Sequence, residues 1–144
     1  MSSQRCLKFV QSVLYLRVTA ARPGVVNFEL PIEKHHTNRL NILHGGTIAS
    51  MVDLGGSLAV ASRGLFATGV STDLNGMCDL HDKMRMGYTN KGVSLVTYLN
   101  SGGKIGDLIR AEVTCDKFGK TLAYTSINFH NEKQELVARG SHTK

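Results

Sequence analysis

Asn38-Arg39-Leu40-Asn41-Ile42-Leu43-His44-Gly45-Gly46-Thr47 is the stretch that decides the fold of this chain, because it leads from a polar loop into an almost wholly apolar segment, Ile48 to Ala61. We expect one long helix from about Gly46 to Ser62, closed by the signal Arg63-Gly64. A helix that begins after His-Gly-Gly leaves backbone N–H groups free at its first turn. Such groups suit an oxyanion or a polarised carbonyl.

Asp53 is the only charged residue of this apolar segment. On a helical wheel it falls on a different face from the apolar stripe formed by Ile48, Met51, Val52 and Ala59, so the stripe can pack inward while the acid faces a cleft. The pattern favours a base beside an oxyanion hole. Two simpler interpretations remain: a buried acid satisfied by a serine or a partner subunit, and a glycine pair that only makes a tight turn.

The rest of the chain predicts β-strands separated by turn signals. The expected strands are Arg17 to Ala21, Val25 to Leu30, Val70 to Leu74, Val93 to Leu99, Asp107 to Lys117, Leu122 to His130 and Leu136 to Ser141, after a helix or helix end at Val10 to Leu16. One helix and a run of antiparallel strands make an α+β layer, with the helix wrapped by the sheet.

The length and composition indicate one globular domain. The chain has 144 residues, of which 42% are hydrophobic, and we treat residues 1–144 as a single unit. No apolar run approaches the ~20 residues that a membrane helix requires, so we expect a soluble protein without a transmembrane segment.

The charge and the cysteines narrow the class of partner and the compartment. A net charge of +6 favours anionic partners, but the basic residues are scattered and no nucleic-acid motif is present, so we expect no nucleic acid partner. The three cysteines are an odd number at unrelated spacings, which favours a reducing compartment. Residues 1–22 are basic and contain no acid, which is typical either of a mitochondrial targeting segment or of a first helix packed on the domain. We expect a cytoplasmic or mitochondrial protein.

Several motifs together resemble one known family. They are His35-His36-Thr37-Asn38, His44-Gly45-Gly46, Val52-Asp53, Gly69-Val70-Ser71-Thr72-Asp73-Leu74-Asn75, Gly119-Lys120-Thr121-Leu122-Ala123-Tyr124-Thr125-Ser126 and Ala138-Arg139-Gly140-Ser141-His142-Thr143-Lys144. The chain resembles the hotdog-fold acyl-CoA thioesterases, in the branch of PaaI-like enzymes and thioesterase superfamily member 2. The resemblance implies hydrolysis of a fatty or aromatic acyl-CoA to the free acid and coenzyme A, without metal or redox cofactor, by a homodimer or homotetramer.

The resemblance also assigns roles to four residues. Gly45 supplies the N–H that polarises the thioester carbonyl, Asp53 is the base or orients the water, Asn38 helps to place water or carbonyl, and Ser71 assists from a strand. It places the acid and the glycine loop of one site on different subunits, which implies an obligate dimer.

Further residues are expected to bind substrate around this centre. His44 and Gly46 flank the glycine loop, and His44 is expected to act as a structural hydrogen bonder rather than as a base. A sparse basic rim of Lys117, Lys120, Arg139 and Lys144 suits the phosphates of coenzyme A.

The segment from about Gly76 to Val96 has no counterpart in the family pattern, and we interpret it as an insertion that interrupts one long strand. Either Ser71 keeps its place in the site, or Lys91 to Leu99 forms the strand and Ser71 is displaced; Ser94 would face the wrong side to replace it. Cys78, His81 and Asp82 in this segment indicate a polar loop rather than a metal site.

Two other functions compete with thioester hydrolysis. Hydration of an enoyl thioester usually needs an acid and a histidine a few residues apart at the helix start, whereas His44 precedes the helix and Asp53 lies within it. A non-catalytic acyl-CoA binding or scaffold subunit would explain the interrupted strand.

Overall fold

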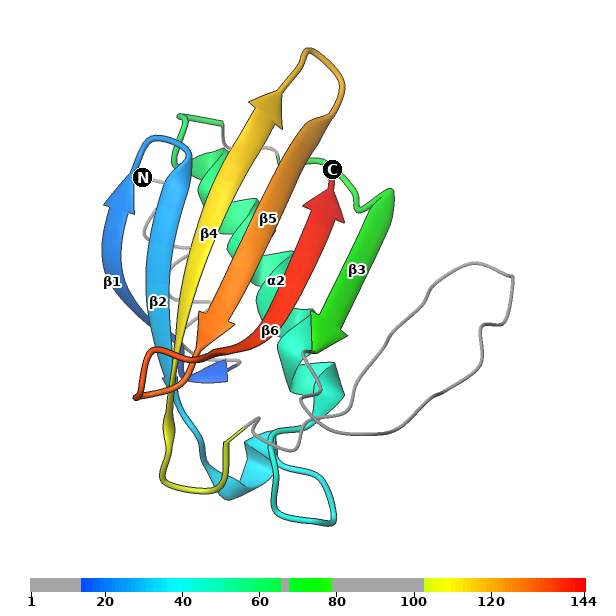
Figure 1. The fold of residues 1–144 in the computed structure, drawn as a ribbon. Helices are drawn as coiled ribbons and strands as arrows, with labels where there is room; N and C mark the ends of the chain where they lie inside the picture. Colours follow the sequence, from blue (N-terminus) through cyan, green and yellow to red (C-terminus); the bar gives the residue numbers. More distant parts are fainter. Residues whose placement is uncertain (1–13, 66–67, 79–102) are drawn as a thin grey trace.

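The computed structural model describes residues 14–65, 68–78 and 103–144, and within these ranges it forms one antiparallel sheet and one long helix (Figure 1). The sheet has six strands in the order β1-β2-β4-β5-β6-β3. The elements are β1 Arg17–Arg22, β2 Val25–Pro31, the short 3-10 helix η1 Lys34–His36, α2 Gly45–Ala61, β3 Asp73–Cys78, β4 Leu108–Phe118, β5 Ala123–His130 and β6 Leu136–Thr143. Figure 1 shows α2 lying across one face of the sheet, so the expected α+β arrangement is confirmed.

The core lies between α2 and the face of the sheet that covers it. Residues of β4 and β5 alternate between buried and more exposed positions, as expected for strands with one face against a helix. The apolar stripe expected on the helix is buried, because Ile48, Met51, Val52 and Ala59 are each at most 5% exposed. Burying a side chain as large as that of Ile48, Met51 or Val52 stabilises the fold by roughly 1.5–3 kcal/mol.

The glycine pair in the middle of α2 lets the helix approach the sheet closely. A Cβ on Gly55 would lie 2.9 Å from Cγ2 of Val113 and 3.1 Å from the ring of Phe28. A glycine in a helix interior costs about 1 kcal/mol relative to alanine. The close contact with the core explains why this helix carries glycine at a position where its propensity is poor.

The element boundaries differ only slightly from those expected. The helix begins one residue earlier than predicted, β6 runs on to Thr143, and β3 begins at Asp73 rather than Val70. The expected helix at residues 10–16 lies largely outside the described residues, and the expected strand at residues 93–99 lies wholly outside them.

Strand β3 corrects the start of the expected insertion. Gly76, Met77 and Cys78 pair in register with Gly140, Arg139 and Ala138 of β6. These three residues are therefore part of the sheet ladder, because β6 is long enough to pair with them, and an insertion can begin only after Cys78. Residues 79–96, with His81, Asp82, Lys91 and Ser94, lie outside the described part of the chain.

Candidate active site

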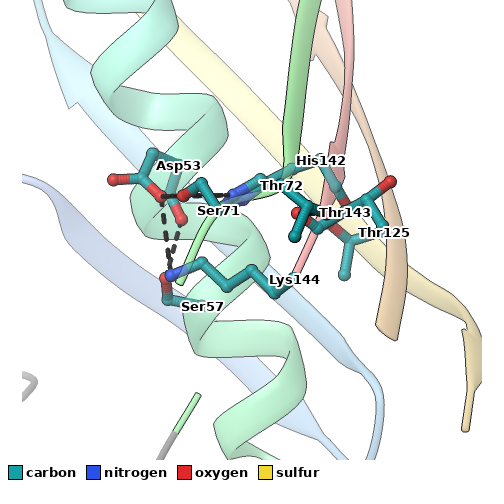
Figure 2. A network of polar contacts seen from close by, with 8 residues as sticks. All are labelled: Asp53, Ser57, Ser71, Thr72, Thr125, His142, Thr143 and Lys144. Atoms are coloured by element: carbon teal, nitrogen blue, oxygen red, sulfur yellow. Dashed lines mark hydrogen bonds and ion pairs between the residues drawn. The ribbon is translucent and has the colours of Figure 1, made fainter. Parts of the chain in front are cut away.

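Asp53 lies at the centre of a polar cluster between α2 and the end of the sheet (Figure 2). Its side chain is 47% exposed, and three groups approach the same oxygen, Oδ1: the Ser71 hydroxyl at 3.2 Å, His142 Nε2 at 3.4 Å and Lys144 Nζ at 3.6 Å. Within the described residues no hydrogen bond or ion pair reaches Oδ2. The carboxylate is thus held by one oxygen and open at the other.

Ser71 reaches this cluster from a bend that precedes β3, not from the strand itself as expected. The bend is fixed to the end of β6, because the N–H of Thr72 donates to the carbonyl of Thr143 at 2.9 Å. The structure therefore brings the predicted residues Asp53 and Ser71 together, although β3 starts two residues later than Ser71.

His142 completes the cluster, and the sequence analysis did not single it out as a site residue. It lies on β6 and is 1% exposed, and its Nε2 lies 2.8 Å from the Ser71 hydroxyl. Its backbone carbonyl accepts from the Thr125 hydroxyl at 2.9 Å. The ring has room because position 56 of α2 is glycine, where a Cβ would lie 2.6 Å from His142 Nδ1. Strand alternation from Ala138 places residue 142 on the inward face, and this was the available signal.

The proton arrangement of the cluster follows from its geometry. Burial lowers the pKa of His142, although the nearby Asp53 carboxylate opposes this effect, so the imidazole is neutral at pH 7. The Ser71 hydroxyl donates its single proton to Asp53 Oδ1, so it can only accept from His142. We therefore assign the ring proton to Nε2. Nδ1 is buried and makes no hydrogen bond within the described residues.

His44 fixes the glycine loop before α2 by capping the helix. The side chain of His44 accepts from the N–H of Gly46 at 2.8 Å and caps the helix, which is a structural hydrogen bond. The backbone carbonyl of His44 accepts from Thr47 and Ile48. The N–H of Gly45 donates to no group within the described residues. Within the described residues Gly45 is therefore a buried residue of the first turn whose N–H is unpaired, whereas the N–H of Gly46 is already occupied.

The loop that carries His44 is fixed by His36, which is 1% exposed. The carbonyl of His36 accepts from the N–H of His44 at 2.8 Å and from the Thr47 hydroxyl at 3.1 Å. Burial lowers the pKa of His36, and the neighbouring His35 acts in the same direction. The backbone carbonyl of this buried residue thus fixes the position of the helix start.

The side chain of Asn38 mainly stabilises its own loop. Its side-chain oxygen accepts from the N–H groups of Leu40 at 2.8 Å and Ile42 at 3.4 Å, which is the local turn use typical of asparagine. Only its amide nitrogen, which has no partner among the described residues, remains for a ligand.

The four residues expected to form a basic rim do not share one surface. Lys117 and Lys120 are exposed around the turn between β4 and β5. Arg139 is exposed on β6, three residues from the inward-facing His142 and therefore on the opposite face of the sheet. The side chain of Lys144 is 10% exposed and reaches Asp53. It therefore does not lie on the exposed surface where a phosphate-binding rim was expected.

The described residues contain no group of three His, Cys, Asp or Glu side chains arranged for a metal ion. None of the helices in these ranges is both long and apolar enough to cross a membrane.

An acid anchored on the helix and an unpaired N–H at the helix start are groups that a hydrolytic site can use. The sequence model of the Thioesterase superfamily matches residues 40–138, and the chain belongs to this family. It is a thioester hydrolase with the hotdog fold, as the sequence analysis expected.

Two relatives and one solved structure illustrate the similarity. A Schizosaccharomyces pombe protein that carries the provisional name of an esterase is 42% identical over 129 residues, which are 90% of this chain and 68% of that protein. Human acyl-coenzyme A thioesterase 13 is 34% identical over 130 residues, 90% of this chain and 78% of that protein. The crystal structure of zebrafish thioesterase superfamily member 2 is 32% identical with a TM-score of 0.71, and the match covers 90% of this chain and 79% of that chain.

Proposed function

We propose that this protein hydrolyses fatty or aromatic acyl-CoA thioesters to the free acid and coenzyme A, with Asp53 as the base and Gly45 as the oxyanion donor. The observation that carries the proposal is the carboxylate of Asp53, which is anchored through Oδ1 and has no partner at Oδ2 among the residues that the structure describes. The name of the human relative, an acyl-coenzyme A thioesterase, supports the class of substrate.

In the proposed reaction Asp53 Oδ2 accepts a proton from water while the water oxygen attacks the thioester carbon. The carbonyl oxygen becomes negative, and the N–H of Gly45 stabilises this charge. When the tetrahedral intermediate collapses, the carbon–sulfur bond breaks and the thiolate leaves. The proton held by Asp53 passes to the thiolate, so acid and thiol are released and the carboxylate is restored. The chain's own groups supply both the base and the oxyanion stabiliser, with no metal or redox cofactor.

Ser71 is not the nucleophile in this proposal. A nucleophilic serine needs a base that can take its proton. In the tautomer that we assign, His142 Nε2 carries a proton and donates it to Ser71, whose own proton is donated to Asp53. We assign Ser71 to orienting the carboxylate and the water beside it.

The proposed site needs a second copy of the chain. Gly45 and Asp53 are eight residues apart on one straight helix, which separates them by about 12 Å along the axis at 1.5 Å per residue. One thioester group cannot contact both in a single chain, because each must lie within about 3 Å of the reacting atoms. We therefore propose a homodimer, or a homotetramer built from such dimers, in which each site combines Asp53 of one subunit with Gly45 of the other.

The capping role of His44 favours hydrolysis over enoyl-CoA hydration, because its Nδ1 is engaged by Gly46. Lys117 and Lys120, around one turn, and Arg139, on a different part of the surface, remain candidates for contacts with the phosphates of coenzyme A.

A thiol-release assay with short, long and aromatic acyl-CoA esters tests the proposal. Asp53→Asn should keep the fold and lower turnover by roughly a hundredfold to ten-thousandfold, the range for a positioned base. Binding of acyl-CoA without turnover by the wild-type protein would instead identify a non-catalytic binding subunit.

Mixing two inactive variants tests whether the site is shared. Gly45→Pro removes the N–H but suits the first position of a helix, and His44 before it has the extended backbone that proline tolerates (φ −76°, ψ 138°). After random exchange of subunits with Asp53→Asn, half of the dimers are mixed and each has one intact site, so the mixture should regain about a quarter of the wild-type activity. A mixture as inactive as its components, with exchange verified by differently tagged subunits, would show that the site lies within one chain.

A further inference from the structure

Lys144 was expected to contact a phosphate of coenzyme A, but its side chain lies in the polar cluster and reaches Asp53. The backbone of Lys144 pairs with Ala123 of β5: its N–H donates to the carbonyl of Ala123 at 2.9 Å, and its carbonyl accepts from the N–H of Ala123 at 2.6 Å. The side chain is 90% buried, and its ammonium lies 3.6 Å from Asp53 Oδ1. Figure 2 shows this side chain running from the end of β6 to Asp53 on the helix.

The charge of Lys144 matters because the other groups at Asp53 are neutral. The hydroxyl of Ser71 carries no charge, and the buried imidazole of His142 is neutral at pH 7. Within the described residues Lys144 is therefore the cation that pairs with this carboxylate. An ammonium attracts a nearby carboxylate electrostatically and so restricts the orientation of the oxygen that it approaches.

We infer that Lys144 is a positioning residue that anchors Asp53 through Oδ1 and so keeps Oδ2 directed at the reacting water. This inference rests on the proposed function and adds a residue to it. A strand-borne lysine with a buried stem is suited to this task, because its backbone is fixed and little side-chain freedom is left to lose. Lys144 acts through Asp53 and is not assigned a contact with substrate.

The test compares two substitutions of Lys144 with a matched control. Lys144→Met removes the charge and keeps the length of the stem, whereas Lys144→Arg keeps the charge. Lys133→Met removes the same charge from an exposed position in the turn between β5 and β6, at the opposite end of these strands. We expect Lys144→Met to lower turnover about tenfold to a hundredfold with little change in KM, Lys144→Arg to stay within about threefold of wild type, and Lys133→Met to leave both constants unchanged.

Two further measurements separate positioning from the alternatives. In the Asp53→Asn background Lys144→Met should cause no further loss, since a residue that acts only through Asp53 has nothing left to position. The same fractional loss should appear with an acyl N-acetylcysteamine thioester, which has the reacting group but none of the coenzyme A phosphates. Far-ultraviolet circular dichroism and melting curves check that each variant is folded, and Lys144→Gln is a second neutral variant if Lys144→Met does not fold.

Three results would overturn the inference. A loss confined to KM and to the coenzyme A ester would make Lys144 a phosphate contact. An equal loss in the Asp53→Asn background would show a role independent of the acid, and unchanged turnover in Lys144→Met would show no role. A wild-type protein that hydrolyses neither ester would refute the proposed function itself, so the two failures can be told apart.

Discussion

Gly56→Ala tests whether the close approach of α2 to His142 on the sheet is needed for the site. The new Cβ would lie 2.6 Å from His142 Nδ1 and 2.7 Å from the Thr125 hydroxyl, distances at which something must shift. Alanine improves helix propensity by about 1 kcal/mol, but overpacking a core costs about 1–3 kcal/mol. Loss of the hydrogen bond from Thr125 to the carbonyl of His142 would add about 1 kcal/mol. We therefore expect a net destabilisation of about 1–3 kcal/mol.

Gly55→Ala is the matched control for this prediction. Its Cβ would meet Val113, Phe28 and Ile127 at 2.9–3.2 Å, so it overpacks the core without touching His142. Both variants should melt lower, by about 3–4 °C per kcal/mol for a domain of this size. Only Gly56→Ala should also lower turnover, by about tenfold, because it moves the imidazole that donates to Ser71.

The measurements are thermal denaturation by circular dichroism and thiol release at a temperature where both variants are folded. If Gly56→Ala were as stable and as active as wild type, the helix would not approach His142 as closely as described. If Gly55→Ala lost as much turnover as Gly56→Ala, the effect on activity would come from general loosening of the core.

Two further predictions concern pH and charge. Burial lowers the folded-state pKa of both His142 and His36, so below pH ~6.5 the unfolded chain binds protons that the folded chain does not bind. The contribution of these two histidines to the free energy of unfolding should be complete above that pH and should fall as the pH drops toward 5. The fall is at most about 1.4 kcal/mol per pH unit for each histidine. Melting curves from pH 7 to pH 5 check this, and a His36→Gln variant with the same slope as wild type would contradict it. Neutralising Lys117 and Lys120 together should raise KM for acyl-CoA more than it lowers turnover, because contacts with phosphate stabilise ground state and transition state alike; a loss in turnover alone would exclude that role.

The parts of the site that lie on local sequence could be predicted. The helix, Asp53 on it and Gly45 at its start follow from one stretch of periodic apolar residues, since helix faces and caps depend on neighbours a few residues away. The same logic identified His44 as a hydrogen bonder, and the structure shows it capping the helix.

The parts that depend on strand register could not be predicted in the same way. His142 meets Ser71 across 71 positions of sequence, and this contact depends on the pairing of β6 with β3 and on the open space at Gly56. Charge alone suggested a phosphate contact for Lys144, but its pairing with Ala123 directs the side chain to Asp53. The sequence gives the charge of Lys144, whereas the pairing of the strands determines which group its side chain contacts.

The burial of His142 also gives this site a natural spectroscopic reporter. The ring proton assigned to Nε2 is hydrogen-bonded to Ser71 at 2.8 Å on a side chain only 1% exposed, and both features slow its exchange with water. Such a proton should persist long enough to give its own downfield signal in a proton NMR spectrum. Ligands that reorder the bend at Ser71 would shift this signal, so occupancy could be followed without any label and even with substrates that are not turned over.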